Sequence, residues 1–242
     1  MRTVALVPAR LESTRLEKKL LRSISDLPLI VLTSKNLISS NLFDDVCVVT
    51  DSDEIIDVLK KHSINYLKST KVYETGTDRI AEFANNFDCE IIINVQGDEP
   101  FINKDDLKLI INTFKEDLEN KIDVISLKRE ISNMDDLENP NNVKVICDND
   151  SNAIYFSRKA LPYNRSKSNL KHYKHIGVYA FRKKALFSFS KLKKSVLEKA
   201  EMIEAIRFIE NGIKIKILEV FNEYISIDTI EDLKRVKKIL ND

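Results

Sequence analysis

The N-terminal half of the chain alternates short runs of β-branched and other apolar residues with amphipathic stretches. This alternation is typical of βαβ units, which assemble into a mostly parallel sheet. The pattern predicts strands at 3–7, 45–50, 64–67, 91–95 and 123–127. It predicts helices at 29–40, 53–62, 77–87 and 103–119. Because strand–helix–strand crossovers are right-handed, these elements indicate a doubly wound α/β core.

From about residue 128 the pattern changes to irregular polar segments and more widely separated strands. The strands are predicted at 143–147, 153–157 and 174–181, and the helices at 183–190 and 197–211. We interpret residues 128–212 as a substrate lobe inserted into the sheet. A last strand at 213–220 precedes a terminal helix at 229–240, and Thr229 and Asp232 have the spacing of a capping box, with Asp where Glu or Gln is usual.

Composition excludes some classes of protein. The 242 residues are 43% hydrophobic, which is enough for a large core, and no linker or repeat divides them, so we treat 1–242 as a single domain. Lys and Arg (39) balance Asp and Glu (38), which leaves no overall field for nucleic acid or an acidic membrane. No apolar run approaches the roughly 20 residues that span a bilayer, and the N-terminus lacks a signal-peptide pattern. We therefore expect a cytoplasmic protein.

The three cysteines, Cys47, Cys89 and Cys147, lie far apart beside apolar residues. They form neither a C-x-x-C metal pair nor an even disulfide set, so we interpret them as reduced core residues.

A basic loop follows the first predicted strand and contains Arg10, Ser13, Arg15, Lys18 and Lys19. Ligands of α/β sheets bind outside the carboxyl ends of the strands, so a positive loop at this place indicates a polyanion such as a nucleotide. Neither a G-x-G-x-x-G nor a P-loop motif occurs among the four glycines, so any phosphates must be held largely by side chains. The alternative is an ordinary solvated surface loop.

The apolar run Ile91-Ile-Ile-Asn-Val leads directly into Gln96-Gly-Asp-Glu-Pro. Two carboxylates at the exposed end of a buried strand suit Mg²⁺, which takes one or two carboxylates and completes its shell with water and phosphate oxygens. Asp98 is the first candidate ligand. The alternative is a plain turn, because Gly, Asp and Pro favour turns. Asp228, which follows a short strand, suits a helix cap or a second metal carboxylate, and the bare sequence favours the cap.

The segment Glu74-Thr-Gly-Thr-Asp-Arg79 begins an amphipathic helix. The small residues around Gly76 allow a ring or phosphate to approach the backbone closely. The alternative is an ordinary helix N-cap.

Taken in order, these segments resemble the 3-deoxy-manno-octulosonate cytidylyltransferases (CMP-Kdo synthetases) over nearly the whole chain. The resemblance is carried by Pro8-Ala-Arg-x-x-Ser-Thr-Arg-Leu, Thr75-Gly-Thr-Asp-Arg-Ile-Ala-Glu, Asn94-Val-Gln-Gly-Asp-Glu-Pro, Asn139-Pro-Asn-Asn-Val-Lys-Val, Tyr155-Phe-Ser-Arg, His175-Ile-Gly-Val-Tyr, Leu197-Glu-x-x-Glu-Met-x-Glu and Asp228-Thr-x-Glu-Asp-Leu. Each motif alone is weak, but their shared order and spacing are specific.

The resemblance implies a Rossmann-like, doubly wound, mixed and mostly parallel sheet of the nucleotide-diphospho-sugar transferase type, with an inserted substrate and dimerisation lobe. It implies Mg²⁺-dependent transfer of CMP from CTP to the anomeric hydroxyl of an eight-carbon ulosonic acid, Kdo, with release of pyrophosphate, for lipopolysaccharide synthesis. It also implies a homodimer.

The resemblance also assigns roles to residues. The implied catalytic residues are Arg10, Arg15, Lys19 and Asp98. The implied nucleotide-binding residues are Ala9, Arg10, Ser13, Arg15, Lys19, Thr75, Gly76 and Arg79. The implied ligands of Mg²⁺ are Asp98 and Asp228. The implied acceptor-binding residues are Gln96, Arg158, His175, Tyr179, Glu201 and Glu204, with the Arg158 guanidinium on the sugar carboxylate.

For four of the implied acceptor-binding residues, a purely structural role is the alternative. His175 and Tyr179 share one face of a strand and could simply pack under the lobe. Glu201 and Glu204 lie three residues apart on one helix face and could be solvated partners of Lys199 or Arg207.

The chain also departs from the family pattern. Glu17-Lys-Lys-Leu stands where the family usually has Pro-Gly-Lys-Pro, so a glycine and both prolines are lost while Lys19 is kept. Ile24-Ser-Asp-Leu-Pro-Leu lacks a further Gly and Lys. Ala205 stands where the family often carries Gln, which favours an acceptor with altered substitution such as 8-amino-Kdo. Two further hypotheses are a sialic-acid cytidylyltransferase and a nucleotide-binding protein without turnover.

Overall fold

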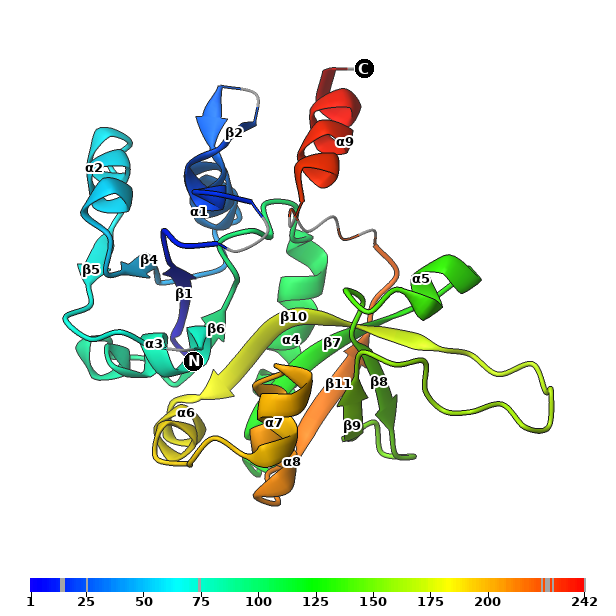
Figure 1. Ribbon diagram of the computed structural model, residues 1–242. Coiled ribbons are helices and arrows are strands. Elements are labelled where there is room, and N and C mark those ends of the chain that lie inside the picture. The colour runs from blue at the N-terminus through cyan, green and yellow to red at the C-terminus, as the bar shows by residue number, and fades with distance from the viewer. Residues whose placement is uncertain are drawn as a thin grey trace. The chain divides into compact units, whose positions relative to one another are not determined.

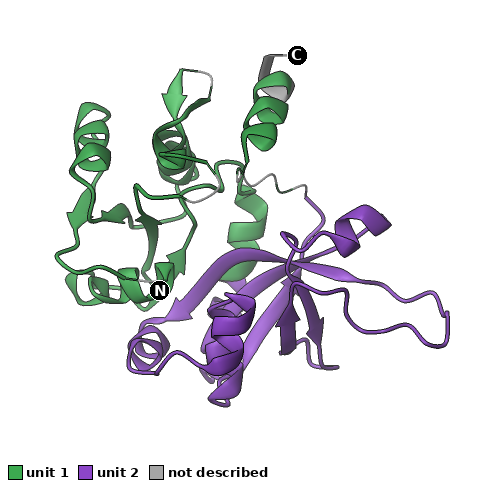
Figure 2. Ribbon diagram, viewed as in Figure 1, with its two compact units in different colours: residues 1–111, 223–242 green, residues 112–222 purple. Residues whose placement is uncertain are grey.

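The computed structural model describes residues 1–13, 16–24, 26–73, 75–222, 224, 227 and 229–241. The chain forms two compact units (Figure 2). Unit 1 comprises Met1–Ile111 and Glu223–Asp242, and unit 2 comprises Asn112–Asn222. The predicted lobe, residues 128–212, lies within unit 2.

Unit 1 contains four parallel strands in the order β6-β1-β4-β5 (Figure 1). They are β1 (Thr3–Ala9), β4 (Asp45–Thr50), β5 (Tyr66–Lys68) and β6 (Ile91–Asn94). Every residue of β1 and β6 is buried, as expected for strands covered on both faces. The apolar runs of the sequence therefore predicted the parallel half of the fold correctly.

The helices of this half also follow the predicted pattern. They are α1 (Leu29–Ser39), α2 (Asp53–Lys61), α3 (Gly76–Ala81), α9 (Ile230–Asn241) and α4 (Lys104–Glu116), whose last residues belong to unit 2. The helix predicted at 77–87 is too long, because α3 ends at Ala81 and a separate 3-10 turn, η2 (Ala84–Asn86), follows. Asn85 and Asn86, both poor helix formers, lie in this 3-10 turn and disfavour an α-helix that continues to residue 87. The pattern missed a short hairpin, β2 (Ser23–Ile24) and β3 (Leu27–Pro28), and the 3-10 turn η1 (Lys19–Leu21).

Unit 2 contains the three strands β11-β7-β10, in which β7 (Val124–Glu130) is parallel to β11 (Ile215–Glu219) and antiparallel to β10 (Tyr173–Arg182). A second antiparallel pair, β8 (Lys144–Cys147) and β9 (Ala153–Ser157), joins β10 through β8. The helices are α5 (Met134–Glu138), α6 (Lys183–Ser190), α7 (Val196–Glu201) and α8 (Ala205–Glu210). The chain thus has the expected mixed, mostly parallel α/β architecture.

The single helix predicted at 197–211 is wrong. The backbone of Met202 is left-handed, with φ 54°, and separates α7 from α8. Such a conformation is costly for a residue with a side chain, so tertiary contacts must support it. The adjacent Glu201 supplies them, because its carboxylate and its backbone carbonyl both bind the end of β9.

The predicted capping box of α9 is confirmed, with Asp in the usual Glu position. The amide and hydroxyl of Thr229 donate to the Asp232 carboxylate over 2.8 and 2.9 Å, and the Asp232 amide donates back to Thr229 Oγ1 over 3.2 Å. The three cysteines are free; Cys47 and Cys89 are buried, as predicted, whereas Cys147 is only half-buried. Within the described part of the chain, no helix is long and apolar enough to cross a membrane.

Candidate active site

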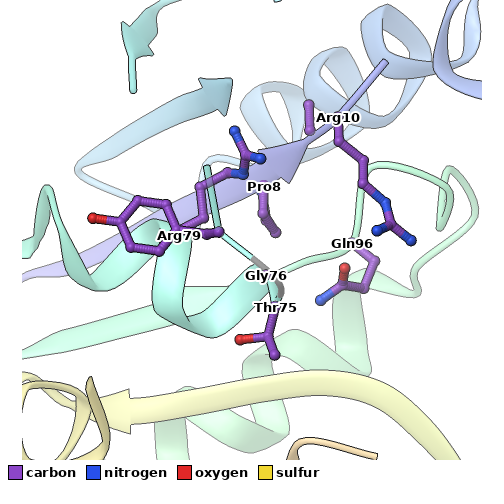
Figure 3. A pocket seen from close by; sticks show the side chains of 8 residues that line it. Pro8, Arg10, Thr75, Gly76, Arg79 and Gln96 are labelled. Carbon is purple, nitrogen blue, oxygen red and sulfur yellow. The ribbon is translucent and has the colours of Figure 1, made fainter. Parts of the chain in front are cut away.

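A pocket opens in unit 1 at the carboxyl end of β1 (Figure 3). It is lined by Pro8, Ala9, Arg10, Tyr73, Thr75, Gly76, Arg79 and Gln96. Three separate segments contribute these side chains: the end of β1, the start of α3 and the loop after β6. Parallel pairing of β6 with β1 places the ends of both strands at the same edge of the sheet. The nucleotide residues predicted from two distant motifs therefore meet here.

A second recess adjoins the first and shares Pro8, Arg10 and Gln96 with it. Its other lining residues are Glu12, Ser13, Lys19, Leu20, Gly97 and Asp98. The ammonium of Lys19 forms an ion pair with the Asp98 carboxylate, and their side chains are only 13% and 23% exposed. The basic loop therefore faces the carboxylate loop and is not a solvated surface segment at Lys19.

Gly76 lines the pocket at a place where a side chain would meet close neighbours. A Cβ at this position would lie 3.0 Å from Pro8 Cγ and 3.3 Å from Gln96 Nε2. Thr75 caps α3, and its Oγ1 accepts a hydrogen bond of 3.1 Å from the Asp78 amide. The N-cap alternative is thus correct for Thr75, but it does not exclude a role in binding, because the same residue lines the pocket.

Arg79 also lines this pocket, but its guanidinium is already paired. Its Nη1 lies 3.0 Å from Asp51 Oδ1, and its Nη2 donates to Asp51 Oδ2 over 3.1 Å. The Arg79 side chain is 4% exposed, so the pair holds it firmly against the pocket. The sequence analysis missed Asp51, although its position one residue after β4 was a usable signal, since it lies at the same edge of the sheet as Arg10.

The loop that carries Asp98 is both a turn and a part of the recess. The Glu99 amide donates to the Gln96 carbonyl over 3.1 Å, which closes the turn. The Thr33 hydroxyl donates to the Gly97 carbonyl over 2.9 Å. A side chain at Gly97 would meet Ile30 and Leu20 at 3.1–3.2 Å, so the loop packs tightly on α1. Close packing holds Asp98 toward Lys19 in a defined position.

Two of the predicted residues, Arg15 and Asp228, lie outside the described residues. Ile227, the chain neighbour of Asp228, donates its amide to the Asp98 carbonyl over 3.2 Å. Tyr224 donates to the Asp106 carboxylate over 2.6 Å, which ties the same segment to α4. The segment before α9 therefore returns to the Asp98 loop. Among the described residues, no three His, Cys, Asp or Glu side chains form a metal-binding group.

The predicted acceptor residues of unit 2 form two connected groups. In the first, both carboxylate oxygens of Glu201 are used, by the Ser157 hydroxyl at 2.7 Å and the Arg158 amide at 2.9 Å. Arg158 Nε donates to the Glu201 carbonyl over 2.8 Å, and its Nη1 donates to the Pro140 carbonyl over 2.9 Å. Glu201 thus braces Arg158, and it is not a solvated partner of Lys199.

Lys144 supports the same platform and was not singled out from the sequence. Its side chain is fully buried in unit 2. Its ammonium donates to the carbonyls of Asn139 at 3.0 Å, Asn142 at 2.6 Å and Arg158 at 2.5 Å. Desolvation by burial lowers the pKa of this lysine. One cation therefore joins the Asn139–Asn142 turn to the end of β9, close to the Arg158 guanidinium.

The second group surrounds His175 and Tyr179 on β10. Their ring centroids lie 5.3 Å apart, and Phe156 contacts His175 edge-on at 4.8 Å. Burial lowers the pKa of His175 to about 3, so its imidazole is neutral near pH 7. Burial and the nearby Glu204 carboxylate raise the pKa of Tyr179 well above its ordinary value. Both rings are therefore uncharged hydrogen-bonding groups, and Glu204 lies near Tyr179.

Arg207, considered above as a partner of Glu201 or Glu204, forms an ion pair with Glu198. Arg207 Nη2 donates to Glu198 Oε1 over 2.6 Å, and its Nε donates to Oε2 over 2.8 Å. Both residues are buried, with 3% and 1% exposure. This pair belongs to the core of unit 2.

Comparison with known proteins agrees with the fold and the site. A cytidylyltransferase family model matches residues 4–215. The 3-deoxy-manno-octulosonate cytidylyltransferase of Flavobacterium johnsoniae is 45% identical over 100% of both chains. That of Christiangramia forsetii is 45% identical over 99% of this chain and 97% of the relative.

A solved structure of CMP:2-keto-3-deoxy-manno-octonic acid synthetase in complex with CTP is 30% identical, with a TM-score of 0.92, and covers 100% of this chain and 99% of that one. Sequence and structural likeness thus extend over the residues that form the pocket of unit 1 and over the predicted acceptor residues of unit 2. The chain belongs to the cytidylyltransferase family, together with the 3-deoxy-manno-octulosonate cytidylyltransferases that it matches from end to end.

Proposed function

We propose that the chain transfers CMP from CTP to the anomeric hydroxyl of Kdo in the cytoplasm, which gives CMP-Kdo and pyrophosphate for lipopolysaccharide synthesis. The observation that carries the proposal is the meeting of Arg10, Ser13, Lys19 and Asp98 in one recess of a chain that matches named Kdo cytidylyltransferases over its full length. A bond forms between the anomeric oxygen and the α-phosphorus, and the bond from that phosphorus to the pyrophosphate oxygen breaks. The hydroxyl proton is released.

The residues of unit 1 suit this reaction. Phosphoryl-type transfer needs positioning and charge neutralisation more than covalent help from the protein. Arg10 and Lys19 supply charge-assisted donors that stabilise the triphosphate and the leaving pyrophosphate. Ser13 adds a hydroxyl donor to the same recess. Because Gly76 has no side chain, the base or ribose can approach the backbone between Pro8 and Gln96.

A magnesium ion fits the donors at the Asp98 loop. Mg²⁺ takes one or two carboxylates and fills its remaining positions with water and phosphate oxygens. The Asp98 carboxylate is partly exposed, and the segment next to Asp228 is bonded to its backbone. We propose these two aspartates as the ligands. When bound, the ion lowers the pKa of the attacking hydroxyl and neutralises phosphate charge.

The residues of unit 2 suit a polyhydroxylated acid. Arg158 is a donor for the sugar carboxylate, and its orientation is set by the carbonyls of Glu201 and Pro140. His175 and Tyr179 supply neutral groups for the hydroxyls of the acid. Ala205 is fully buried at the start of α8, so an amide is missing there where the family often has one. This keeps 8-amino-Kdo as the second candidate acceptor.

The first prediction concerns pyrophosphate release from CTP with three acceptors supplied separately: Kdo, 8-amino-Kdo and sialic acid. We expect release with Kdo, dependence on Mg²⁺, and loss of activity when EDTA removes the metal, because the triphosphate and hydroxyl need the ion. Clear preference for 8-amino-Kdo would show that this sugar is the acceptor in place of Kdo. Preference for sialic acid would show that the chain is a sialic-acid cytidylyltransferase. Absence of pyrophosphate release with all three acceptors would contradict the proposed transfer and favour a non-catalytic nucleotide-binding protein.

We also propose a homodimer. Unit 2 exposes large apolar side chains that a solvated surface does not require, among them Val196 at 81%, Met202 at 81% and Phe221 at 82%. A partner subunit would remove these side chains from water. Sedimentation velocity at micromolar concentration is expected to give twice the mass of one chain. A species with the mass of one chain over the whole concentration range would contradict the dimer.

A further inference from the structure

Ser126 is a fully buried hydroxyl in the middle of β7. It pairs with Tyr179 of β10, directly beside an irregularity in the ladder. Ile176 pairs with Leu127 and Tyr179 with Ser126, so β10 has two extra residues, Gly177 and Val178, between them. A bulge of this kind re-aims the neighbouring side chains.

The hydroxyl of Ser126 has one proton and three polar neighbours. Its oxygen lies 2.7 Å from the Val178 carbonyl, 3.3 Å from the Ile176 carbonyl and 2.8 Å from His175 Nε2. A carbonyl oxygen can only accept, whereas the roles of Ser126 Oγ and His175 Nε2 depend on the tautomer of the imidazole. When the Ser126 proton is directed to the bulge, where the Val178 carbonyl is at the shorter distance, His175 Nε2–H donates and Ser126 Oγ accepts.

The other ring nitrogen of His175 follows from this assignment. A neutral imidazole has one N–H, so Nδ1 carries a lone pair and can only accept. In the described part of the chain, Nδ1 has no hydrogen-bond partner, and it is not among the buried side-chain atoms that lack one. It therefore reaches the surface of the half-buried His175 side chain. Phe156 and Tyr179 hold the ring on two sides, at 4.8 and 5.3 Å.

We propose that Ser126 is a positioning residue for acceptor recognition: it holds His175 as the Nε2–H tautomer, so that Nδ1 accepts a hydrogen bond from a hydroxyl of the sugar acid. The identity of the ligand as a sugar acid rests on the proposed function. The tautomer of His175 rests only on the contacts within unit 2. The low pKa of His175 agrees with it, because a charged imidazole would donate from both nitrogens. A sugar substituent that cannot donate a hydrogen bond is disfavoured next to His175, because Nδ1 would be left without a partner.

The first test is the tautomer itself, read from the ¹⁵N chemical shifts of His175 in the ligand-free full-length protein. We expect Nε2 to carry the proton at pH 7. In Ser126→Ala the Nε2–H form should lose its dominance, and Ser126→Thr, which keeps the hydroxyl, should restore it. This measurement needs neither turnover nor a bound ligand, so it stays decisive if a variant is inactive.

The second test is steady-state kinetics with the same variants. We expect Ser126→Ala to raise KM for Kdo about five- to tenfold, the range of one ordinary hydrogen bond, and to leave KM for CTP unchanged. Ser126→Thr should keep the wild-type KM. In a His175→Phe background, Ser126→Ala should have no further effect on KM for Kdo, because its influence passes through His175.

Two results would overturn the inference: a proton on Nδ1 in the wild-type protein, or a Ser126→Ala effect on KM for Kdo that is absent or persists fully without His175. Failure of the proposed function is distinguishable from both. In that case the wild-type protein would release no pyrophosphate with Kdo, although the ¹⁵N shifts would still show the Nε2–H tautomer. The sugar hydroxyl would then be the wrong ligand for Nδ1. The role of Ser126 in orienting His175 would still be supported.

Discussion

Replacing Asp98 by Asn is expected to lower kcat for CMP transfer by about 10²- to 10³-fold, the usual effect of removing one group that stabilises charge in the transition state. The substitution is nearly isosteric, but it removes the negative charge that faces Lys19 in the recess. A neutral amide is a poor ligand for Mg²⁺ in comparison with a carboxylate. The measurement is pyrophosphate release at saturating CTP and acceptor over a range of Mg²⁺ concentrations.

Asp105→Asn is the matched control, because Asp105 is an exposed carboxylate at the start of α4 whose side chain is 80% accessible. It should leave kcat unchanged. Circular dichroism and thermal unfolding should show both variants folded. An Asp98→Asn protein that keeps more than about a tenth of wild-type kcat would contradict the assignment of Asp98 to the reacting centre.

Replacing Arg207 by Met is expected to lower the free energy of unfolding by about 3–5 kcal/mol, because it leaves the buried Glu198 carboxylate without its cation. Arg207 makes two hydrogen bonds to that carboxylate and packs its guanidinium over the Phe189 ring at 4.3 Å. Glu198 also accepts from the Ser195 amide at 3.2 Å, in the capping box of α7. Urea unfolding at fixed protein concentration measures the change.

Lys199→Ala is the control for this experiment, since Lys199 lies on α7, the helix of Glu198, but is exposed. It should change the free energy of unfolding by no more than about 0.5 kcal/mol. The double variant Glu198→Gln with Arg207→Met should recover much of the loss, because no unpaired charge remains buried. A stability of the Arg207→Met protein equal to that of Lys199→Ala would show that the pair contributes little.

The residues that we propose for the nucleotide, in unit 1, were easier to predict from the sequence than those that we propose for the acceptor, in unit 2. Arg10 and Asp98 each follow a buried strand that stands out as an apolar run, and the carboxyl ends of parallel strands share one edge of the sheet. Their proximity thus follows from strand type alone. Arg79 was placed correctly at the pocket, but its partner Asp51 comes from a third strand end, and no motif connects the two positions.

The residues that we propose for the acceptor are positioned by contacts that no local sequence pattern indicates. The break at Met202 contradicts the helical periodicity of 197–211, and it exists because Glu201 binds Ser157 and Arg158 from another part of unit 2. In the sequence, Lys144 cannot be distinguished from any other lysine in a strand. In the structure, its ammonium donates hydrogen bonds to three carbonyls from two segments. Periodicity reports which face of an element is buried, whereas these features depend on which polar atoms meet once it is buried.

The sequence by itself determined the α/β class, most strands and helices of unit 1, and the shared sheet edge at which Arg10 and Asp98 lie, because each follows from hydrophobic period and strand-end chemistry. Only the tertiary structure decided the pairing of Arg207 with Glu198, the bracing of Arg158 by Glu201, and the contact of Ser126 with His175 across a bulge. These are polar contacts between residues 9 to 49 positions apart. Their partners are selected by the need of buried polar atoms for hydrogen bonds, which becomes specific only when the elements have packed.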